Sequence, residues 1–551
     1  MPRIQIEHDR RAAELFLQKG LWNEDTLPSV VERFSITRPG HPALLTPTRS
    51  VSYAQLWDAS RELAVSLVEL GIGEGDVVAA QLPNIEEFVV TYLAVNLIGA
   101  IFQPIHLPYR TPDLRAFLGH SGAKAFIGLS RRDDYRPVDE VLALRPELPA
   151  LRHVIAADAA NPDCITLADL KSSGSIVGAR STPDTPCLLL YTSGTTTNPK
   201  AVPHAHRTLM STAAISAEEF GLSGKDIVLT LSRFSHMWGA ITLLMTLREG
   251  ATSLLLPNFA ADRFAQFVET LRPSFVFGAP IHLIQTSRER LFEQHDFSSI
   301  RVVATSGSVF PVDQLQTINK QLPNGQIVEL WGMTEIGPAA FTRPGTPPEL
   351  SAGTIGTPIP GFEMRIVAPD GKPVGDGEQG ELEVQGIGVF TGYLGNPQAN
   401  AASFTPDGWF RTGDLAIRND NGRYCITGRV KEVINRGGVK FSPLEVERTL
   451  ITHPRIRACA VVPVADPIYG ERACCCAVVD GDEPPLTLED ICAYLQEKEI
   501  GKILWPERLE LLPELPMTAT GKVCKGLLTE MMEARVMSAA SAETAHAPAL
   551  R

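Results

Sequence analysis

Several classes of protein are disfavoured by what this sequence lacks. Basic residues are few: 50 Lys and Arg stand against 63 Asp and Glu, a formal net charge of −13, whereas nucleic-acid binding needs a basic surplus to neutralise phosphates. The most apolar stretch, residues 88–102, is interrupted by Thr91, Tyr92 and Asn96. It is too short to span a bilayer and predicts a buried helix instead. The first residues are charged and lack the apolar segment of a signal peptide.

Cysteine patterns that would indicate a metal or disulfide framework are also missing. The nine cysteines, an odd number, contain no Cys-x-x-Cys pair. This disfavours a zinc site and favours reduced thiols in the cytoplasm. The adjacent Cys474, Cys475 and Cys476 lie in an apolar stretch. We expect a buried strand there, in which cysteine acts as a small apolar residue.

What the sequence does contain is a long alternation of helix-like and strand-like segments. A chain of 551 residues exceeds the size of a single core, so at least two domains are expected. Repeated alternation predicts parallel sheets covered by helices, an α/β fold. The expected elements are helices at 53–70, at 86–97 and from 111, and strands at 76–81, near 101 and at 125–128.

The composition of the sequence changes after about residue 354, where turn residues become frequent between short expected strands such as 380–384. This pattern predicts a barrel-like subdomain. Beyond Gly428 we expect a small α/β unit with a helix near 443–449 and strands near 458–464 and 473–479. The predicted organisation is a large domain over 1–430, a small mobile C-terminal domain over 431–536 and a flexible tail over 537–551.

The sharpest local motif is Tyr191-Thr-Ser-Gly-Thr-Thr-Thr-Asn-Pro-Lys200, which follows an apolar strand. Clustered hydroxyls and backbone N–H groups can surround phosphate oxygens, Gly194 permits close approach, and Lys200 adds a positive charge. No Gly-Lys-Ser/Thr ending is present, so this is not a Walker A loop. The alternative is a Ser/Thr-rich surface turn.

This segment resembles the phosphate loop of the adenylate-forming superfamily, which includes acyl-CoA synthetases, peptide-synthetase adenylation domains and beetle luciferases. The chain looks most like an acyl- or aryl-CoA ligase. Four further motifs of that superfamily occur in the expected order, and the resemblance runs from about Leu21 to Leu528. These motifs are Trp331-Gly-Met-Thr-Glu335, Gly408-Trp-Phe-Arg-Thr-Gly-Asp-Leu415, Gly428-Arg-Val-Lys-Glu-Val-Ile-Asn-Arg-Gly-Gly438 and Pro516-Met-Thr-Ala-Thr-Gly-Lys522.

The resemblance implies that the enzyme uses ATP and Mg²⁺ to activate a carboxylic acid as its acyl-adenylate. Glu335 would bind the metal, since magnesium prefers hard oxygen ligands. Thr334 would contact the α-phosphate, Trp331 would stack on adenine and Asp414 would bind the ribose hydroxyls. The complete set of expected nucleotide contacts is Thr192, Ser193, Gly194, Thr195, Thr196, Lys200, Ser308, Trp331, Gly332, Met333, Thr334, Asp414 and Arg429.

The resemblance also assigns roles in the small domain. Lys522 would bridge the attacking carboxylate and the α-phosphate when that domain closes, which offsets charge that develops in the transition state. Lys431 occupies the hinge position, and the domain would then swing to admit coenzyme A. Coenzyme A contacts would come from Gly437, Gly438 and Lys440.

The acid and its acceptor are less closely specified. His236 matches a histidine that flanks the acid's carboxylate in the superfamily, although a structural histidine is the alternative. The expected pocket walls are Met237, Trp238, Ser306 and Gly307. No Asp stands near His236 to hold an ammonium, so an aromatic, cyclic or medium-chain acid is favoured over an amino acid.

Two acceptors stay open, coenzyme A and a carrier protein loaded in trans, and a non-catalytic relative is disfavoured because Lys200, Glu335, Asp414 and Lys522 are present. Two substitutions also depart from the superfamily pattern. Thr197 and Ala201 stand where glycine is usual, and both are expected to stiffen the phosphate loop.

Overall fold

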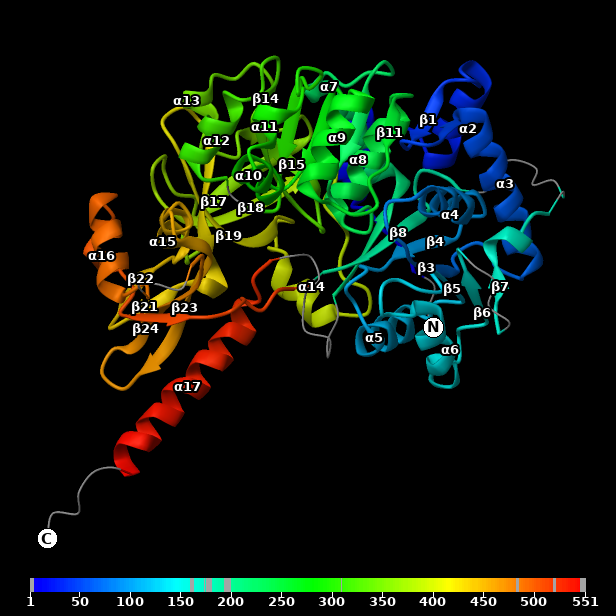
Figure 1. Ribbon diagram of the computed structural model, residues 1–551. Helices are drawn as coiled ribbons and strands as arrows, with labels where there is room; N and C mark the ends of the chain where they lie inside the picture. Colours follow the sequence, from blue (N-terminus) through cyan, green and yellow to red (C-terminus); the bar gives the residue numbers. More distant parts are fainter. Residues whose placement is uncertain are drawn as a thin grey trace, which may run out of the picture. The chain divides into compact units, whose positions relative to one another are not determined.

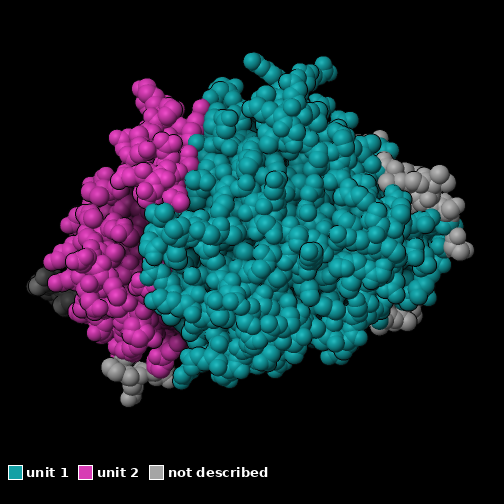
Figure 2. Space-filling view, turned by 90° about the horizontal axis from the view of Figure 1, so that it is seen from above, with its two compact units in different colours: residues 1–310, 315–364, 384–411 teal, residues 311–314, 365–383, 412–551 magenta. Residues whose placement is uncertain are grey.

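The computed structural model describes residues 4–158, 163–172, 174, 181–192, 200–308, 310–481, 485–518 and 522–545. The chain divides into two compact units, drawn in different colours in Figure 2. Unit 1 contains residues 1–310, 315–364 and 384–411, and unit 2 contains residues 311–314, 365–383 and 412–551. The domain limits at residues 430 and 536 stay predictions.

The first half of unit 1 is built on a seven-stranded sheet with the order β7-β6-β5-β3-β4-β8-β9. All pairings are parallel except that of β8 with β9. The predicted helix–strand alternation is confirmed here. The strands are β3 (Val77–Gln81), β4 (Ile101–Pro104), β5 (Ala125–Gly128), β6 (His153–Ala156), β7 (Ile165–Thr166), β8 (Pro186–Tyr191) and β9 (Ala201–Ala205); the helices are α3 (Tyr53–Glu69), α4 (Glu86–Leu97), α5 (Thr111–Ser121) and α6 (Pro137–Leu144).

A nine-stranded sheet forms the rest of the framework of unit 1, with the order β16-β15-β14-β13-β12-β10-β11-β1-β2. Its centre, β10 to β14, is parallel and buried. The strands are β1 (Pro42–Leu45), β2 (Ser50–Ser52), β10 (Ile227–Thr230), β11 (Thr252–Leu254), β12 (Phe275–Gly278), β13 (Val302–Thr305), β14 (Gln326–Met333), β15 (Gly337–Phe341) and β16 (Thr357–Pro358).

Helices cover these sheets, as Figure 1 shows for α8 and α9 beside the green strands. Two of them are apolar nearly all round, α4 and α8, and their residues are mostly buried. A helix that is apolar on all sides needs protein around it. Helix α4 confirms the buried helix predicted within the apolar run at 88–102, while the last two residues of that run belong to β4. The remaining helices are α1 (Arg10–Gln18), α2 (Leu27–Thr37), α7 (His206–Phe220), α8 (Met237–Arg248), α9 (Ala261–Leu271), α10 (Pro280–Arg288), α11 (Leu291–Gln294), α12 (Val312–Asn319), α13 (Pro348–Ser351) and α14 (Pro397–Ser403).

The glycine-rich stretch forms a four-stranded sheet, β17-β18-β19-β20, through whose strands the division between the units passes. The strand expected at 380–384 is β18, and β19 pairs with β20 in antiparallel fashion. The bounds are β17 (Phe362–Val367), β18 (Gly380–Gly386), β19 (Phe410–Arg418) and β20 (Tyr424–Arg429).

Unit 2 also contains a five-stranded sheet with its own core. β23 and β24 form a long antiparallel hairpin, and Cys474, Cys475 and Cys476 are buried in β24, as predicted. The elements are β21 (Ile434–Arg436), β22 (Val439–Phe441), β23 (Ile456–Asp466), β24 (Gly470–Val479), β25 (Arg508–Leu511), α15 (Leu444–Leu450), α16 (Leu488–Glu497) and α17 (Lys525–Ala545). Helix α17 includes the first residues of the expected tail. None of the helices in the described ranges is both long and apolar enough to cross a membrane.

Candidate active site

The carboxyl ends of the parallel strands of both large sheets meet in unit 1. Asn84, which follows β3, donates from Nδ2 to the carbonyl oxygen of Ser232 (2.9 Å) and accepts from the N–H of Phe234 (2.8 Å), beyond the end of β10. His106, which follows β4, contacts Ser235 (Nδ1 to Oγ, 2.8 Å). Crevices at such strand ends are the usual ligand sites of open α/β sheets.

The phosphate-loop motif connects two paired strands at this edge. Tyr191 ends β8, β9 starts at Ala201, and the N–H of Thr192 donates to the carbonyl oxygen of Lys200 (3.0 Å), which closes the base of the loop. The Lys200 ammonium lies 4.6 Å from the ring centroid of Tyr393. The predicted contacts Ser193, Gly194, Thr195 and Thr196, and also Thr197, lie outside the described residues.

The predicted metal ligand Glu335 lies just beyond β14 and is buried. Its Oε1 accepts a hydrogen bond from the Tyr393 hydroxyl (2.8 Å), and its carbonyl oxygen accepts from the N–H of Phe390 (2.9 Å). Burial and the neighbouring carboxylate raise the pKa of Tyr393, so the phenol stays protonated and donates.

The end of β14 positions the predicted nucleotide contacts beside Glu335. Gly332 is required by packing, because a Cβ there would lie 2.2 Å from the carbonyl oxygen of Gly337 in β15. The carbonyl oxygen of Thr334 accepts from Nε2 of His204 (2.8 Å). Burial lowers the pKa of His204 to about 4, so its imidazole is neutral near pH 7 and this nitrogen carries the proton.

Two other predicted contacts of this strand differ in exposure: Trp331 is buried on β14, whereas Met333 is partly exposed. Three further predicted residues follow β13, the strand that pairs with β14. Ser306 is buried and its N–H donates to the carbonyl oxygen of Gly278 (3.0 Å), while Gly307 and Ser308 are exposed.

The predicted acid-binding residues lie at the start of α8. His236 caps this helix, its Nδ1 accepting from the N–H of Trp238 (3.3 Å). Met237 and Trp238 are buried, and Trp238 Nε1 donates to the carbonyl oxygen of Gly278 (3.1 Å). The indole therefore lies against the end of β12.

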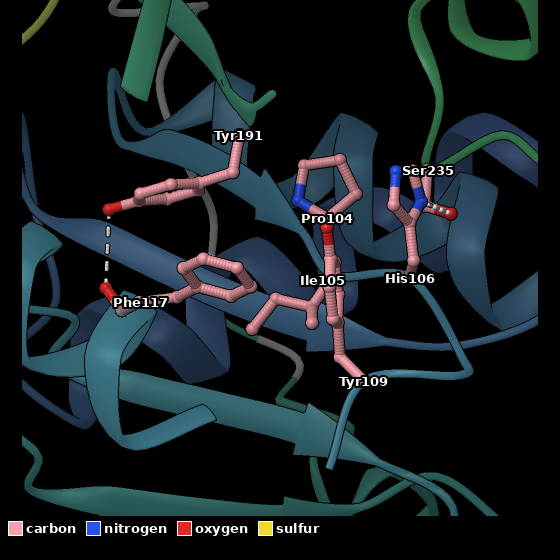
Figure 3. Close-up of a pocket in the computed structure, with 7 residues that line it drawn as sticks. All are labelled: Pro104, Ile105, His106, Tyr109, Phe117, Tyr191 and Ser235. Carbon is pink, nitrogen blue, oxygen red and sulfur yellow. Dashed lines mark hydrogen bonds between the residues drawn. The ribbon is translucent and has the colours of Figure 1, made fainter. Parts of the chain in front are cut away.

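A small pocket lies at the edge where β4 and β8 end (Figure 3). The His106 ring is stacked 6.0 Å from that of His236, and burial, followed by the nearby His236 and Arg233, lowers the pKa of His106 to about 3. The pocket therefore has a neutral imidazole at one end. Its lining residues are Pro104, Ile105, His106, Tyr109, Phe117, Tyr191 and Ser235.

In unit 2, Asp414 and Arg429 face each other across β19 and β20. Asp414 is buried, and its Oδ1 lies 3.0 Å from Nε of Arg429. The Asp414 N–H donates to the hydroxyl of Thr412 (3.0 Å). The two predicted nucleotide contacts of this unit are thus held together as an ion pair.

The predicted hinge and coenzyme A residues are exposed. Lys431 lies in the short 3₁₀ turn Val430–Glu432. Gly437 and Gly438 form the two-residue turn between β21 and β22, with φ of +57° and +90°. Such a turn needs left-handed backbone at both positions, which explains both glycines without any ligand. Lys440 is exposed on β22.

The predicted catalytic lysine is hydrogen-bonded through its backbone to Thr518. The Lys522 side chain is exposed, its N–H donates to the hydroxyl of Thr518 (3.1 Å), and its carbonyl oxygen accepts from the Thr518 N–H (2.7 Å). Three residues later, Lys525 contacts Glu432 (2.6 Å) and Glu447 (2.9 Å). Lys525 thereby ties the start of α17 to the segment after the hinge position.

Comparison with known proteins decides the family. The family model described as AMP-binding enzyme matches residues 31–394, and that of the AMP-binding enzyme C-terminal domain matches residues 445–522. The chain belongs to the AMP-binding enzyme family. It is therefore a member of the adenylate-forming superfamily, as the motifs predicted.

Individual members of the AMP-binding family are similar along nearly the whole chain. A salicyl-AMP ligase / salicyl-S-ArCP synthetase of Mycobacterium tuberculosis is 32% identical and covers 96% of this chain and 94% of its own. A medium-chain fatty-acid–CoA ligase of Escherichia coli is 29% identical, and the match covers 95% of this chain and 93% of that protein. The crystal structure of the anthranilate CoA ligase AuaEII with anthranoyl-AMP has a TM-score of 0.85 at 25% identity, over 93% of this chain and 98% of that one. The predicted fold is confirmed.

The geometry fits the Mg²⁺ that AMP-binding enzymes use with ATP. Glu335 offers a buried carboxylate that accepts a hydrogen bond from a phenol, and magnesium takes few ligands from protein and more from phosphate oxygens. The structure also reveals contacts that sequence reasoning missed. Tyr393, His106 and His204 contact the predicted site residues Glu335, His236 and Thr334, and only the position of His106 shortly after a strand offered a signal.

Proposed function

We propose that this protein activates a small carboxylic acid as its acyl-adenylate and transfers the acyl group to coenzyme A. In the first step a carboxylate oxygen attacks the α-phosphorus of ATP, and pyrophosphate leaves as its bond to that phosphorus breaks. In the second step the thiolate of coenzyme A attacks the carbonyl carbon and AMP leaves. The observation that carries the proposal is the proximity of Lys200, Tyr393 and Glu335 at the edge where the parallel strands end.

Each residue has a definite task in this proposal. Both reactants are anions, so positive charge must be delivered where they meet. Lys200 binds phosphate oxygens, Thr334 orients the α-phosphate, and Glu335 holds Mg²⁺, which when bound offsets phosphate charge. Trp331, Gly332, Met333 and Ser308 surround the nucleotide together with the residues of the phosphate loop.

Residues of unit 2 complete the two steps. Asp414 and Arg429 hold the ribose. Lys522 bridges the acid and the α-phosphate during adenylation, and rotation about Lys431 then removes it. Gly437, Gly438 and Lys440 meet coenzyme A in the second step.

The acid is proposed to be aromatic, cyclic or medium-chain. His236 flanks its carboxylate, and Met237, Trp238, Ser306 and Gly307 form the walls. The buried Trp238 supports this choice, because its indole is fixed by a hydrogen bond to the carbonyl oxygen of Gly278 and packs edge-on against Phe277 at 5.4 Å. In the proposed acid site, an indole held in this way limits the length of the acid.

A second candidate acceptor is the thiol of a carrier protein. The relative from Mycobacterium tuberculosis, at 32% identity, is named as a salicyl-S-ArCP synthetase, whereas the Escherichia coli relative is named as a CoA ligase. The chemistry is the same, since both acceptors present a thiol to the acyl carbonyl carbon. The acceptor is thus a separate question from adenylation.

The test has two stages. Purified protein with ATP, Mg²⁺ and a panel of benzoic, cyclic and C6–C12 acids is assayed for pyrophosphate release and for acyl-AMP by mass spectrometry. Acids that respond are then offered coenzyme A or a phosphopantetheinylated carrier protein. We expect adenylate with at least one acid and thioester with coenzyme A. Absence of AMP-containing product from every acid would overturn the proposal, and thioester on the carrier alone would replace the first acceptor by the second.

A further inference from the structure

Tyr393 lies between two residues to which the proposed function assigns opposite charges. Its hydroxyl donates to Oε1 of Glu335 (2.8 Å), and its ring centroid lies 4.6 Å from the ammonium of Lys200. The three residues come from separate segments: the end of the phosphate loop, the residues after β14, and the loop before α14. One side chain thus contacts both the expected phosphate-binding cation and the expected metal ligand.

The backbone around Tyr393 is anchored to the same two places. The N–H of Phe390 donates to the carbonyl oxygen of Glu335, and the N–H of Leu394 donates to that of Ala201, each at 2.9 Å. The segment 390–394 therefore connects the residues after β14 with the first residue of β9. The orientation of Tyr393 follows from this double attachment.

Asn400 of α14 fixes the same segment from outside. Its Oδ1 accepts from the Tyr393 N–H (2.7 Å), and its Nδ2 donates to the Tyr393 carbonyl oxygen (3.1 Å). The ring is also packed edge-on against Phe390, with centroids 4.8 Å apart. Because Tyr393 is held in place by these contacts, it can fix the orientation of a side chain that it contacts.

The chemistry of these contacts suits a binding site. A phenol is a neutral donor, so a hydrogen bond to Oε1 fixes the rotation of the Glu335 carboxylate without neutralising its charge. An aromatic face attracts an ammonium but likewise leaves its charge intact. Direct pairing with an ammonium would instead make the carboxylate a poorer metal ligand.

We propose that Tyr393 is a positioning residue, which orients Glu335 for Mg²⁺ through its hydroxyl and seats the Lys200 ammonium for the phosphates through its ring. This inference rests on the proposed function for the identity of the ligand. It assigns two separable parts of one side chain to two different ligand groups, the metal ion and the phosphate chain.

The experiment measures binding without turnover. Isothermal titration calorimetry with the full chain gives the affinity for ATP in EDTA and for ATP with saturating Mg²⁺, and the ratio of the two affinities is the metal coupling. Loss of a hydrogen bond that orients a metal ligand lowers metal affinity about 10- to 100-fold. We therefore expect Tyr393→Phe, which keeps the ring, to reduce the coupling about tenfold and to change metal-free ATP affinity less than about twofold.

Tyr393→Leu removes both parts, so it should reduce the coupling equally and also weaken metal-free ATP binding about threefold, a typical effect of a partly exposed cation–π contact. In a Glu335→Gln background, Tyr393→Phe should have no further effect on the coupling. The matched control is Tyr135→Phe, because Tyr135 also carries a cation over its ring, Arg110 at 4.2 Å, and its buried hydroxyl makes no hydrogen bond with any described residue. That variant should match the unsubstituted protein.

Unchanged coupling in a folded Tyr393→Phe variant would overturn the proposal. So would an equal effect of Tyr393→Phe with and without Glu335. Tyr393→Phe is nearly isosteric, so it decides the hydroxyl's role even if Tyr393→Leu fails to fold. A protein that binds Mg²⁺–ATP with the expected coupling but forms no adenylate would refute the proposed function and leave the role of Tyr393 standing.

Discussion

The two units each hold a partly buried group of charges around a lysine, but they arrange the charges differently. In unit 1, Glu335 accepts from the neutral Tyr393 hydroxyl, while Lys200 lies over the ring of the same tyrosine. In unit 2, Lys525 contacts the carboxylates of Glu432 and Glu447 directly, at 2.6 and 2.9 Å. The first arrangement is called here the Tyr393 cluster and the second the Lys525 cluster.

The difference separates binding from architecture. In the Lys525 cluster, burial opposes the charge on the lysine, but the two carboxylates together raise its pKa. The ammonium is therefore protonated, and the adjacent carboxylates balance its charge. It joins the segment after the hinge position, α15 and α17 into one body. In the Tyr393 cluster a neutral group orients the charges without cancelling them, which is what a site for Mg²⁺ and phosphate requires.

The largest effect is expected from breaking the Lys525 cluster. Lys525→Met leaves two carboxylates close together without their cation, and breaking such a buried pair costs about 3 kcal/mol of unfolding free energy. Lys525→Arg keeps the charge and should lose less than about 1 kcal/mol. Urea unfolding followed by hydrogen exchange of peptides from 412–545 measures both. Equal stability of the two variants would show that charge is unimportant there.

The next effect tests Lys522, the proposed catalytic lysine, which precedes the Lys525 cluster along the chain. Lys522→Ala should slow adenylation about a hundredfold, about 2.7 kcal/mol, as removal of a key transition-state donor does. It should still convert supplied acyl-adenylate and coenzyme A into thioester. Rapid-quench assays of each half-reaction separate the steps, and an equal loss in both would contradict the proposed domain alternation.

A fall in pH is expected to reduce the stability of unit 1 more than that of unit 2. Burial lowers the pKa of His106 and of His206 to about 3 and that of His282 to about 4. The native state therefore holds these groups neutral, whereas the unfolded chain binds protons below pH 6.5. Their stabilisation is present above pH 6.5 and is lost as the pH falls toward 3–4, by about 2 kcal/mol per histidine between pH 6.5 and 5.

Hydrogen exchange at pH 7, 6 and 5 measures this slope separately for peptides of the two units. In unit 2, burial also lowers the pKa of His453, but this histidine is only partly buried. His206→Asn should reduce the pH dependence of the stability of unit 1 by the contribution of one histidine. A slope equal in both units would show that the buried imidazoles accept protons without penalty.

The smallest effect concerns the proposed binding site for the carboxylic acid in unit 1. Neither charge cluster determines which acid is bound there. Trp238→Leu should shift the ratio of kcat/KM values toward a longer acid about tenfold, the usual worth of one or two methylenes in an apolar pocket. Competition between a short and a long acid in one reaction measures this ratio directly. A ratio that stays constant would place the end of the pocket elsewhere.

The elements of the fold were predictable because their signals are local. The helices at 53–69 and 86–97 and the strands at 77–81 and 125–128 follow the periodicity of apolar residues, which reports the buried face of each segment. The buried strand with three cysteines was predicted for the same reason. The domain limits depend on packing between segments, which periodicity does not report.

The site divides in the same way. The five motifs led to the prediction of Glu335, Lys200 and Lys522 as site residues because their neighbours along the chain are distinctive, and these roles stay predictions. No such pattern surrounds Tyr393, which is 58 residues from Glu335, or Lys525, which is 93 residues from Glu432. Their partners are set only when separate segments pack together.

The sequence by itself determined the family, the order of helices and strands, and local backbone such as the turn at Gly437 and Gly438, since each depends on adjacent residues. The tertiary structure alone decided which charges meet a neutral phenol and which meet a counter-charge. The physical reason is that pairing depends on distances of a few ångströms between side chains, and these distances are fixed by how the sheets and helices pack.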